Sequence, residues 1–129
     1  MIIPNFTGSL EKRMEKLNKI LSGRSDIRLV GSSFGGLMGS IFTMENEAKV
    51  DKLILLAPAI NMTGFSEYRG KTISVPVHVY HGKDDEVIPI KDVEQVAKNT
   101  FINLSFNRMD DDHSLHNTFT SIDWDRLLL

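Results

Sequence analysis

The sequence contains no cysteine, which excludes disulfides, cysteine-based zinc sites and a thiol nucleophile. Charge of one sign is not in excess either, because 15 Lys and Arg stand against 17 Asp and Glu, and this near-neutral balance predicts no binding to nucleic acid or anionic membranes. The longest nearly apolar run, residues 53–60, is too short to cross a bilayer. Residues 1–5 lack the basic and apolar regions of a secretory signal. These absences predict a soluble, cytoplasmic protein.

Length and composition then indicate a single domain covering residues 1–129, with 41% apolar and 25% charged residues. A domain of this size buries roughly two-thirds of its unfolded surface, enough for one core. Neither a G-x-x-x-x-G-K phosphate loop nor a G-x-G-x-x-G dinucleotide motif occurs. We therefore expect no cofactor.

Short β-rich runs alternate with helical patterns along the chain. Helical spacing of apolar residues occurs in residues 10–21, 34–47, 90–97 and 118–129, and the predicted strands are residues 27–30, 53–57, 75–80 and 101–106. Alternation of this kind is typical of a parallel sheet flanked by helices. The predicted fold class is α/β, a three-layer α/β/α sandwich around a mostly parallel sheet.

A G-x-S-x-G motif, Gly31 to Gly35, lies between a predicted strand and a predicted helix. A nucleophile at such a tight turn has strained backbone angles, and we expect Gly31 and Gly35 to provide the space that the turn needs. Ser33 is the candidate nucleophile, and the Phe34 N–H at the start of the helix is the candidate oxyanion donor. An ordinary glycine-rich turn with a capping serine is the alternative interpretation of the same residues.

A serine nucleophile needs a histidine base, and the histidine needs a carboxylate to orient it. Acidic residues occur after the 75–80 strand, in residues 81–89, and the last predicted strand leads to three aspartates and His113. Carboxyl ends of parallel strands share one edge of a sheet, so both loops are expected beside Ser33. Residues 110–112 resemble a cation site but are better interpreted as a solvated loop that favours the imidazolium form of His113, with no metal.

Taken together, the motifs resemble those of the α/β-hydrolases, in particular small serine esterases, over nearly all of the chain. Residues 31–35 resemble the nucleophile elbow, residues 81–89 the acid loop, and His113 the catalytic histidine of that family. The resemblance implies a triad of Ser33, Asp85 and His113, with His81 bracing the acid loop. Asp84 is the alternative acid and His116 the alternative histidine.

Two features depart from the family pattern. The strands that usually come first are missing, and residues 1–6 look like the end of a later strand. The segment between Pro58 and Val75 is too short to hold the usual lid. The resemblance therefore implies a minimal α/β-hydrolase fold without first strands or lid. We expect either self-association into a homo-oligomer through an open sheet edge or a sequence that begins inside a longer reading frame.

The missing segment usually carries a second oxyanion donor, which residues 5–8 are the candidates to replace. An open site without a lid favours small acyl groups, with Met62 and Phe65 expected to form an apolar substrate wall. The first functional hypothesis is a serine hydrolase that cleaves a small ester or thioester through an acyl-enzyme. The alternative is a catalytically weak or inactive hydrolase-fold module that binds a small molecule or a partner chain.

Overall fold

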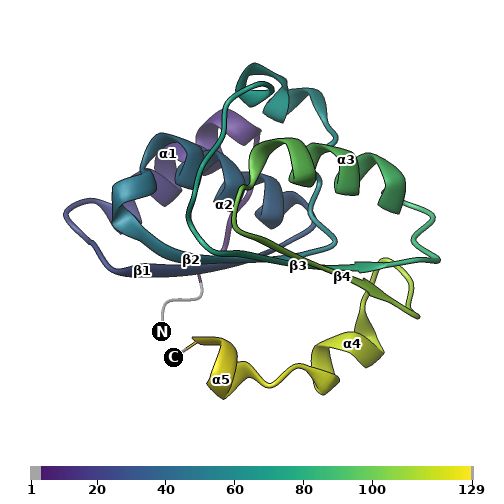
Figure 1. Ribbon diagram of the computed structural model, residues 1–129. Coiled ribbons are helices and arrows are strands. Elements are labelled where there is room, and N and C mark those ends of the chain that lie inside the picture. Colours follow the sequence, from purple (N-terminus) through teal and green to yellow (C-terminus); the bar gives the residue numbers. More distant parts are fainter. Residues whose placement is uncertain (1–3, 129) are drawn as a thin grey trace.

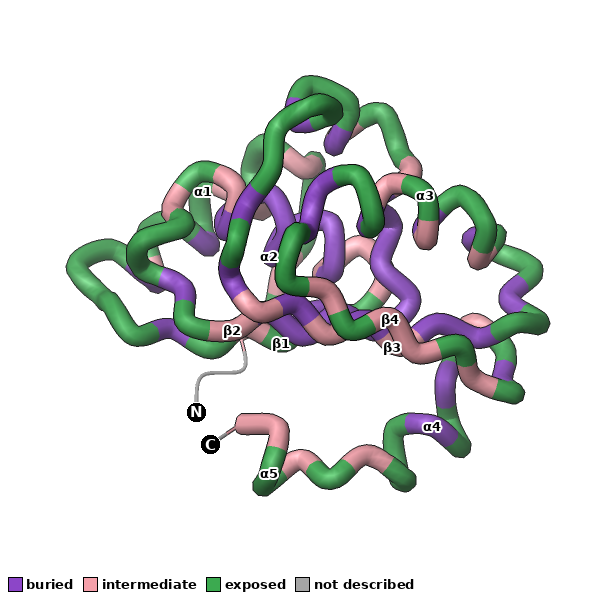
Figure 2. The backbone as a smooth tube through the Cα atoms, viewed as in Figure 1, coloured by how far each residue is buried: buried purple, intermediate pink, exposed green. Residues whose placement is uncertain are grey.

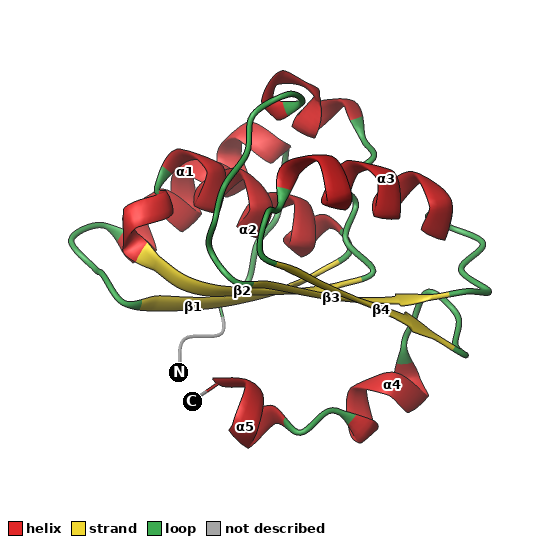
Figure 3. Cartoon of the chain, in the orientation of Figure 1, coloured by secondary structure: helices red, strands yellow, loops and turns green. Residues whose placement is uncertain are grey.

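A computed structural model of the protein describes residues 4–128. Its helices and strands alternate as the sequence predicts (Figure 3). In chain order, the elements are α1 (Leu10–Leu21), β1 (Ile27–Ser32), α2 (Phe34–Glu45), η1 (Glu47–Lys49), β2 (Val50–Leu56), η2 (Thr63–Tyr68), β3 (Val77–Gly82), α3 (Ile90–Thr100), β4 (Leu104–Met109), α4 (His116–Ser121) and α5 (Trp124–Leu128).

The four strands form one parallel sheet in the order β1-β2-β3-β4. Helices α1, α2 and α3 cover one face, and α4 and α5 lie on the other, so the layers are those of an α/β/α sandwich (Figure 1). All four strands therefore end at the same edge of the sheet, which is where the loops after β1, β3 and β4 bring their polar residues together.

Apolar side chains explain this layering. Alternate residues of the strands, such as Leu53, Leu55, Val77 and Val79, are buried against the helices in the main core, and buried positions concentrate between the sheet and these helices (Figure 2). A second cluster joins α1 to α2 through Leu17 and other apolar residues. A third and much smaller apolar cluster lies on the α4 side of the sheet.

Several boundaries differ from the expectations. Strand β4 begins three residues later than predicted, because Phe101 ends α3 and packs into the core. The expected closing helix 118–129 is two short helices, since Asp123 Oδ1 accepts the Arg126 N–H and begins a new helix there. The expected strand end at residues 1–6 falls partly outside the described residues, and residues 4–6 are not in a strand.

Strand β1 is paired only with β2 among the described strands, so its other edge carries no strand in residues 4–128. The self-association expected through that edge stays a prediction. No helix within this described part of the chain is long and apolar enough to cross a membrane.

Candidate active site

Ser33 occupies the single residue between β1 and α2, with φ 52° and ψ −115°. A serine rarely adopts such angles, which persist only where surrounding structure holds the residue in place. Here the Ser33 N–H donates to Leu56 O (2.9 Å), and Ser33 O accepts from the N–H groups of Gly36 (3.0 Å) and Ala59 (2.9 Å). The end of β2 and the start of α2 thus fix the Ser33 backbone and leave its side chain at the edge of the sheet.

Close backbone packing explains one of the two motif glycines but not the other. A Cβ atom on Gly31 would lie 2.3 Å from Gly35 O, a distance that no side chain tolerates. A Cβ on Gly35 would meet nothing within 4 Å. The expectation that Gly35 provides space was therefore wrong, and the second close approach is at Gly36, where a Cβ would lie 2.7 Å from Pro58 Cβ.

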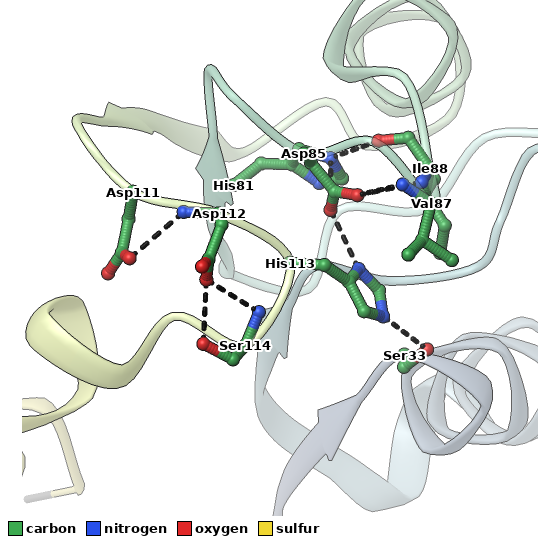
Figure 4. A network of polar contacts seen from close by, with 9 residues as sticks. All are labelled: Ser33, His81, Asp85, Val87, Ile88, Asp111, Asp112, His113 and Ser114. Carbon is green, nitrogen blue, oxygen red and sulfur yellow. Dashed lines mark hydrogen bonds and ion pairs between the residues drawn. The ribbon is translucent and has the colours of Figure 1, made fainter.

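His113 connects the serine to an aspartate, as Figure 4 shows. Ser33 Oγ lies 3.1 Å from His113 Nε2, and His113 Nδ1 lies 2.7 Å from Asp85 Oδ2. An ionised carboxylate only accepts hydrogen bonds, so the proton of a neutral imidazole is on Nδ1 and the Nε2 lone pair faces the serine hydroxyl. We call these three residues the Ser–His–Asp array.

Asp85 is buried, and the acid loop holds its carboxylate through both oxygens. Oδ1 accepts the N–H groups of Val87 (2.9 Å) and Ile88 (2.7 Å), while Oδ2 faces His113. Burial, the largest single influence, raises the pKa of Asp85, but the hydrogen bonds from Ile88, His113 and Val87 together outweigh it and lower the pKa below its ordinary value. The carboxylate is therefore ionised near neutral pH.

His81 lies fully buried behind the same carboxylate. Its Nε2–H donates to Ile88 O (2.8 Å) and lies 3.2 Å from Asp85 Oδ2. Burial lowers the pKa of His81, so the ring is neutral. Its Nδ1 is buried and has no hydrogen-bond partner within residues 4–128. His81 thus packs on the acid loop and does not reach Ser33.

The structure separates the candidates from their sequence neighbours. Asp84 is exposed, and its carboxylate makes no hydrogen bond or ion pair in the described part of the protein. His116 is exposed at the start of α4, three residues beyond the histidine that faces Ser33. Asp85 and His113 are therefore the pair that the fold brings to the serine.

The three aspartates before His113 have separate environments. Asp111 is buried, contrary to the expected solvated loop, and its Oδ2 accepts the Thr118 N–H and hydroxyl, both at 2.8 Å. Asp112 Oδ1 accepts from Ser114, and Asp110 pairs with Lys83 on the surface. No group of three His, Cys, Asp or Glu residues suited to a metal ion occurs among residues 4–128.

Asp111 is a residue that sequence reasoning missed. It joins the loop that carries His113 to the loop that carries Asp85, because Asp84 N–H donates to Asp111 O (3.1 Å) and a Cβ on Gly82 would lie 2.3 Å from that same oxygen. Nothing local in the sequence signals this contact between residues nearly thirty positions apart.

The candidate oxyanion donor is at the start of α2. Phe34 N–H donates to no backbone acceptor within residues 4–128, as expected for the first residue of a helix. Residues 5–8, the candidates for a second donor, contact α1 instead: Arg13 Nε donates to Gly8 O (2.8 Å), and Lys16 Nζ donates to Asn5 O. Their part in an oxyanion site stays a prediction.

Only one of the two residues expected to form the substrate wall is exposed. Met62 is 45% exposed at the start of η2, but Phe65 is fully buried in the core, with its ring centroid 5.4 Å from that of Tyr68. In this conformation Phe65 therefore cannot contact a substrate. It faces inward because η2 turns it toward the main core.

The described surface includes two hollows of different size. The larger, about 350 Å³, is lined mostly by polar residues that flank η2 or lie on α3, including Arg69 and Asp92, and none of its lining residues belongs to the Ser–His–Asp array. The smaller, about 260 Å³, is lined by Leu56, by Ser32 before Ser33 and by residues of the segment that follows His113.

Neither a protein-family model nor a curated protein sequence matches the chain, whereas many solved structures do. A predicted CIB-like hydrolase from Thermoplasma acidophilum superposes with a TM-score of 0.75 at 22% identity, over 94% of this chain and 60% of its own. An α/β serine hydrolase homologue from Coxiella burnetii has a TM-score of 0.69 at 23% identity, over 91% and 55%.

An esterase from Exiguobacterium antarcticum superposes with a TM-score of 0.72 at 15% identity, covering 92% of this chain and 73% of its own. The protein spans less than two-thirds of the length of the Thermoplasma and Coxiella proteins. Three of its four strands, β1, β3 and β4, lead to Ser33, Asp85 and His113. At these identities the likeness establishes architecture, and the protein therefore has the α/β-hydrolase fold.

Proposed function

We propose that this protein is a serine hydrolase that cleaves a small ester or thioester through an acyl-enzyme intermediate. The observation that supports this most is the Ser–His–Asp array, in which Ser33 Oγ, His113 and Asp85 are joined at 3.1 Å and 2.7 Å. Each residue comes from a different loop at the carboxyl edge of the sheet. Similarity in fold to an esterase and to a monoacylglycerol lipase agrees with the proposal.

In the proposed reaction, Ser33 Oγ attacks the substrate carbonyl carbon while His113 Nε2 takes the hydroxyl proton. Asp85 stabilises the imidazolium that forms, and the Phe34 N–H donates to the oxyanion. Collapse of the tetrahedral intermediate breaks the bond to the leaving oxygen or sulfur, which takes the proton from His113. A water molecule, deprotonated by His113, then releases the acid and restores Ser33.

The expected substrates are small because the segment between β2 and β3 is short and contains only η2 and turns. We therefore expect the edge of the sheet near Ser33 to be open to solvent. An open site buries less of a long acyl chain than an enclosed one, and apolar burial is what selects long chains.

A fluorophosphonate probe tests the proposal directly, since it forms a stable adduct only with an activated serine. Intact mass should show one adduct on the wild-type protein and none on Ser33→Ala. Ser105→Ala is the matched control, because Ser105 is an exposed serine on β4 whose loss should leave labelling unchanged.

Absence of an adduct on folded wild-type protein, confirmed by circular dichroism, would contradict the proposal. That result would instead favour a hydrolase-fold module that binds without catalysis. Labelling that survives in Ser33→Ala would identify a different nucleophile and would overturn the role of Ser33.

A further inference from the structure

The smaller hollow lies between the carboxyl ends of β1 and β2 and helix α4. Its lining includes Ser32, which directly precedes Ser33, and Ser114 and Leu115, which directly follow His113. We call it the α4 pocket. Its walls therefore include sequence neighbours of both Ser33 and His113, although these two residues do not themselves line it. The larger hollow near α3 has no such neighbours in its lining.

The chemistry of the α4 pocket is apolar with a hydroxyl rim. Leu56 and Leu115 are buried and Phe119 is 52% exposed, so these side chains supply an apolar floor and wall. Ser32, Ser114 and Thr120 add hydroxyl groups, and His116 adds an imidazole. No Asp, Glu, Lys or Arg is among its lining residues in the described structure, so the pocket suits an uncharged, largely apolar group.

Backbone strain is located in the same place. Leu115 has φ 51° and ψ 32°, the left-handed conformation that a bulky side chain rarely adopts. Its carbonyl accepts the Phe119 N–H at 2.8 Å, which starts α4, and its side chain is buried beside Leu56 and Ala57. Strained residues cluster at ligand sites, and here the strain turns the chain directly after His113 so that α4 forms the pocket wall.

The proposed reaction assigns the pocket to one half of the substrate. His113 Nε2 must return its proton to the departing oxygen, so the leaving group lies on the His113 side of the carbonyl carbon. Five of the residues that line the α4 pocket are from the segment that follows His113, residues 114–120, and include Phe119 and Thr120. The acyl group occupies the remaining direction, away from His113.

We propose that the α4 pocket binds the leaving group of the ester, and that Phe119 makes the enzyme selective for an uncharged alkyl or aryl alcohol. This inference rests on the proposed function. At about 260 Å³ and open to solvent, the pocket holds an alcohol of the size of butanol, hexanol or benzyl alcohol. The departing alcohol forms with the proton from His113, while the acyl carbon stays on Ser33 Oγ.

Isomeric esters separate the two halves of the substrate. Hexyl acetate and ethyl hexanoate have the same atoms, with the long chain on the alcohol in the first and on the acyl group in the second; butyl acetate and ethyl butanoate form a shorter pair. We expect kcat/KM to be about tenfold higher for hexyl acetate than for ethyl hexanoate, since an apolar pocket discriminates by about this much.

Phe119→Ala should lower kcat/KM for hexyl acetate about tenfold and leave that for ethyl hexanoate unchanged. Thr120→Phe, at an exposed position, should obstruct the pocket and have the same selective effect, and it decides the question if Phe119→Ala does not fold. Ile102→Ala is the control, because Ile102 is 69% exposed and lies before β4, outside the pocket lining.

Equal rates for the isomers, or a loss on ethyl hexanoate in the two pocket variants, would overturn the pocket assignment while leaving the proposed function intact. No hydrolysis of any ester, together with no phosphonate adduct on Ser33, would mean that the proposed function itself has failed, and the assignment with it. The two failures are therefore distinguishable.

Discussion

Asp85 Oδ2 lies 2.7 Å from His113 Nδ1 and, on its other side, 3.2 Å from His81 Nε2. The second carboxylate oxygen accepts the N–H groups of Val87 and Ile88. A buried carboxylate held by this many donors has one orientation, which in turn gives His113 one tautomer. The acid loop thus determines which imidazole nitrogen faces Ser33.

The first prediction follows from that tautomer. Asp85→Asn presents an amide N–H to His113 Nδ1, which must then accept a hydrogen bond. The ring proton therefore moves to Nε2, and Nε2 can no longer accept the proton of the Ser33 hydroxyl. We expect kcat to fall about 10⁴-fold with little change in KM. Asp84→Asn is the matched control, since that neighbouring carboxylate is exposed. Equal losses in the two variants would contradict the assignment of Asp85.

The second prediction concerns the stability of the fold at acid pH. Although burial raises the pKa of Asp85, its hydrogen bonds outweigh that effect and the pKa is lowered in the folded protein. A lowered pKa means that the ionised group stabilises the folded state above its unfolded pKa of about 3.9, and that this contribution disappears as the pH falls through the folded pKa.

Urea unfolding of wild type and Asp85→Asn at several pH values measures this contribution. The part of the difference in unfolding free energy that comes from ionised Asp85 should shrink as the pH falls below about 4. Titration of groups that do not contact Asp85 occurs in both proteins and cancels in the comparison. A difference that grows on acidification would show that Asp85 is not held as the ionised form.

Features that depend on neighbouring residues were predictable from the sequence. Ser9 Oγ accepts the Lys12 N–H at the start of α1, and Pro76, which lacks an N–H, directly precedes β3. Ser33, Asp85 and His113 follow β1, β3 and β4, and a parallel sheet places such strand ends together whatever the details of packing.

Features that depend on the direction of a side chain were not predictable. Phe65 and Met62 are three residues apart around a short 3₁₀ helix, and only tertiary packing decides which of them is buried. Asp111 was expected to be solvated because acidic runs usually are, but its partner, Thr118, lies seven residues further along the chain, in α4. Hydrogen bonds between separate elements carry no sequence period that could reveal them.

The third prediction separates the two glycines of the motif. Gly31→Ala places a Cβ against Gly35 O at 2.3 Å, backbone that cannot move without displacing Ser33. We expect a loss of about 3 kcal/mol or more in unfolding free energy and no phosphonate labelling. Gly35→Ala has open space in α2 and should be neutral or stabilising by roughly 0.5 kcal/mol. Similar stabilities, measured by urea unfolding, would contradict the packing argument.

The fourth prediction tests the corrected role of Phe65. Phe65→Ala removes a fully buried ring and should lower the unfolding free energy by about 3–5 kcal/mol, while the relative kcat/KM values of the isomeric esters stay the same. Met62→Ala, at an exposed position in the same segment, should cost less than about 1 kcal/mol. A change in ester selectivity for Phe65→Ala without loss of stability would restore Phe65 to the substrate wall.

The last prediction concerns Asp111 as a positioning residue for His113. Its carboxylate accepts two hydrogen bonds from Thr118. The bond from the Thr118 N–H has the largest effect on the pKa of Asp111 and lowers it. Asp111→Ala frees the start of α4 and lets the loop after β4 shift. A shift of about 1 Å between base and nucleophile costs up to about 10²-fold in rate.

We therefore expect Asp111→Ala to lower kcat by about 10-fold to 100-fold, to change KM little, and to slow phosphonate labelling of Ser33 by the same factor. Asp111→Asn keeps an oxygen acceptor for Thr118 and should recover part of the loss. Asp110→Ala is the control, because Asp110 is on the surface beside Lys83. Equal values of kcat in the three variants would mean that the loop tolerates movement and that Asp85 alone positions His113.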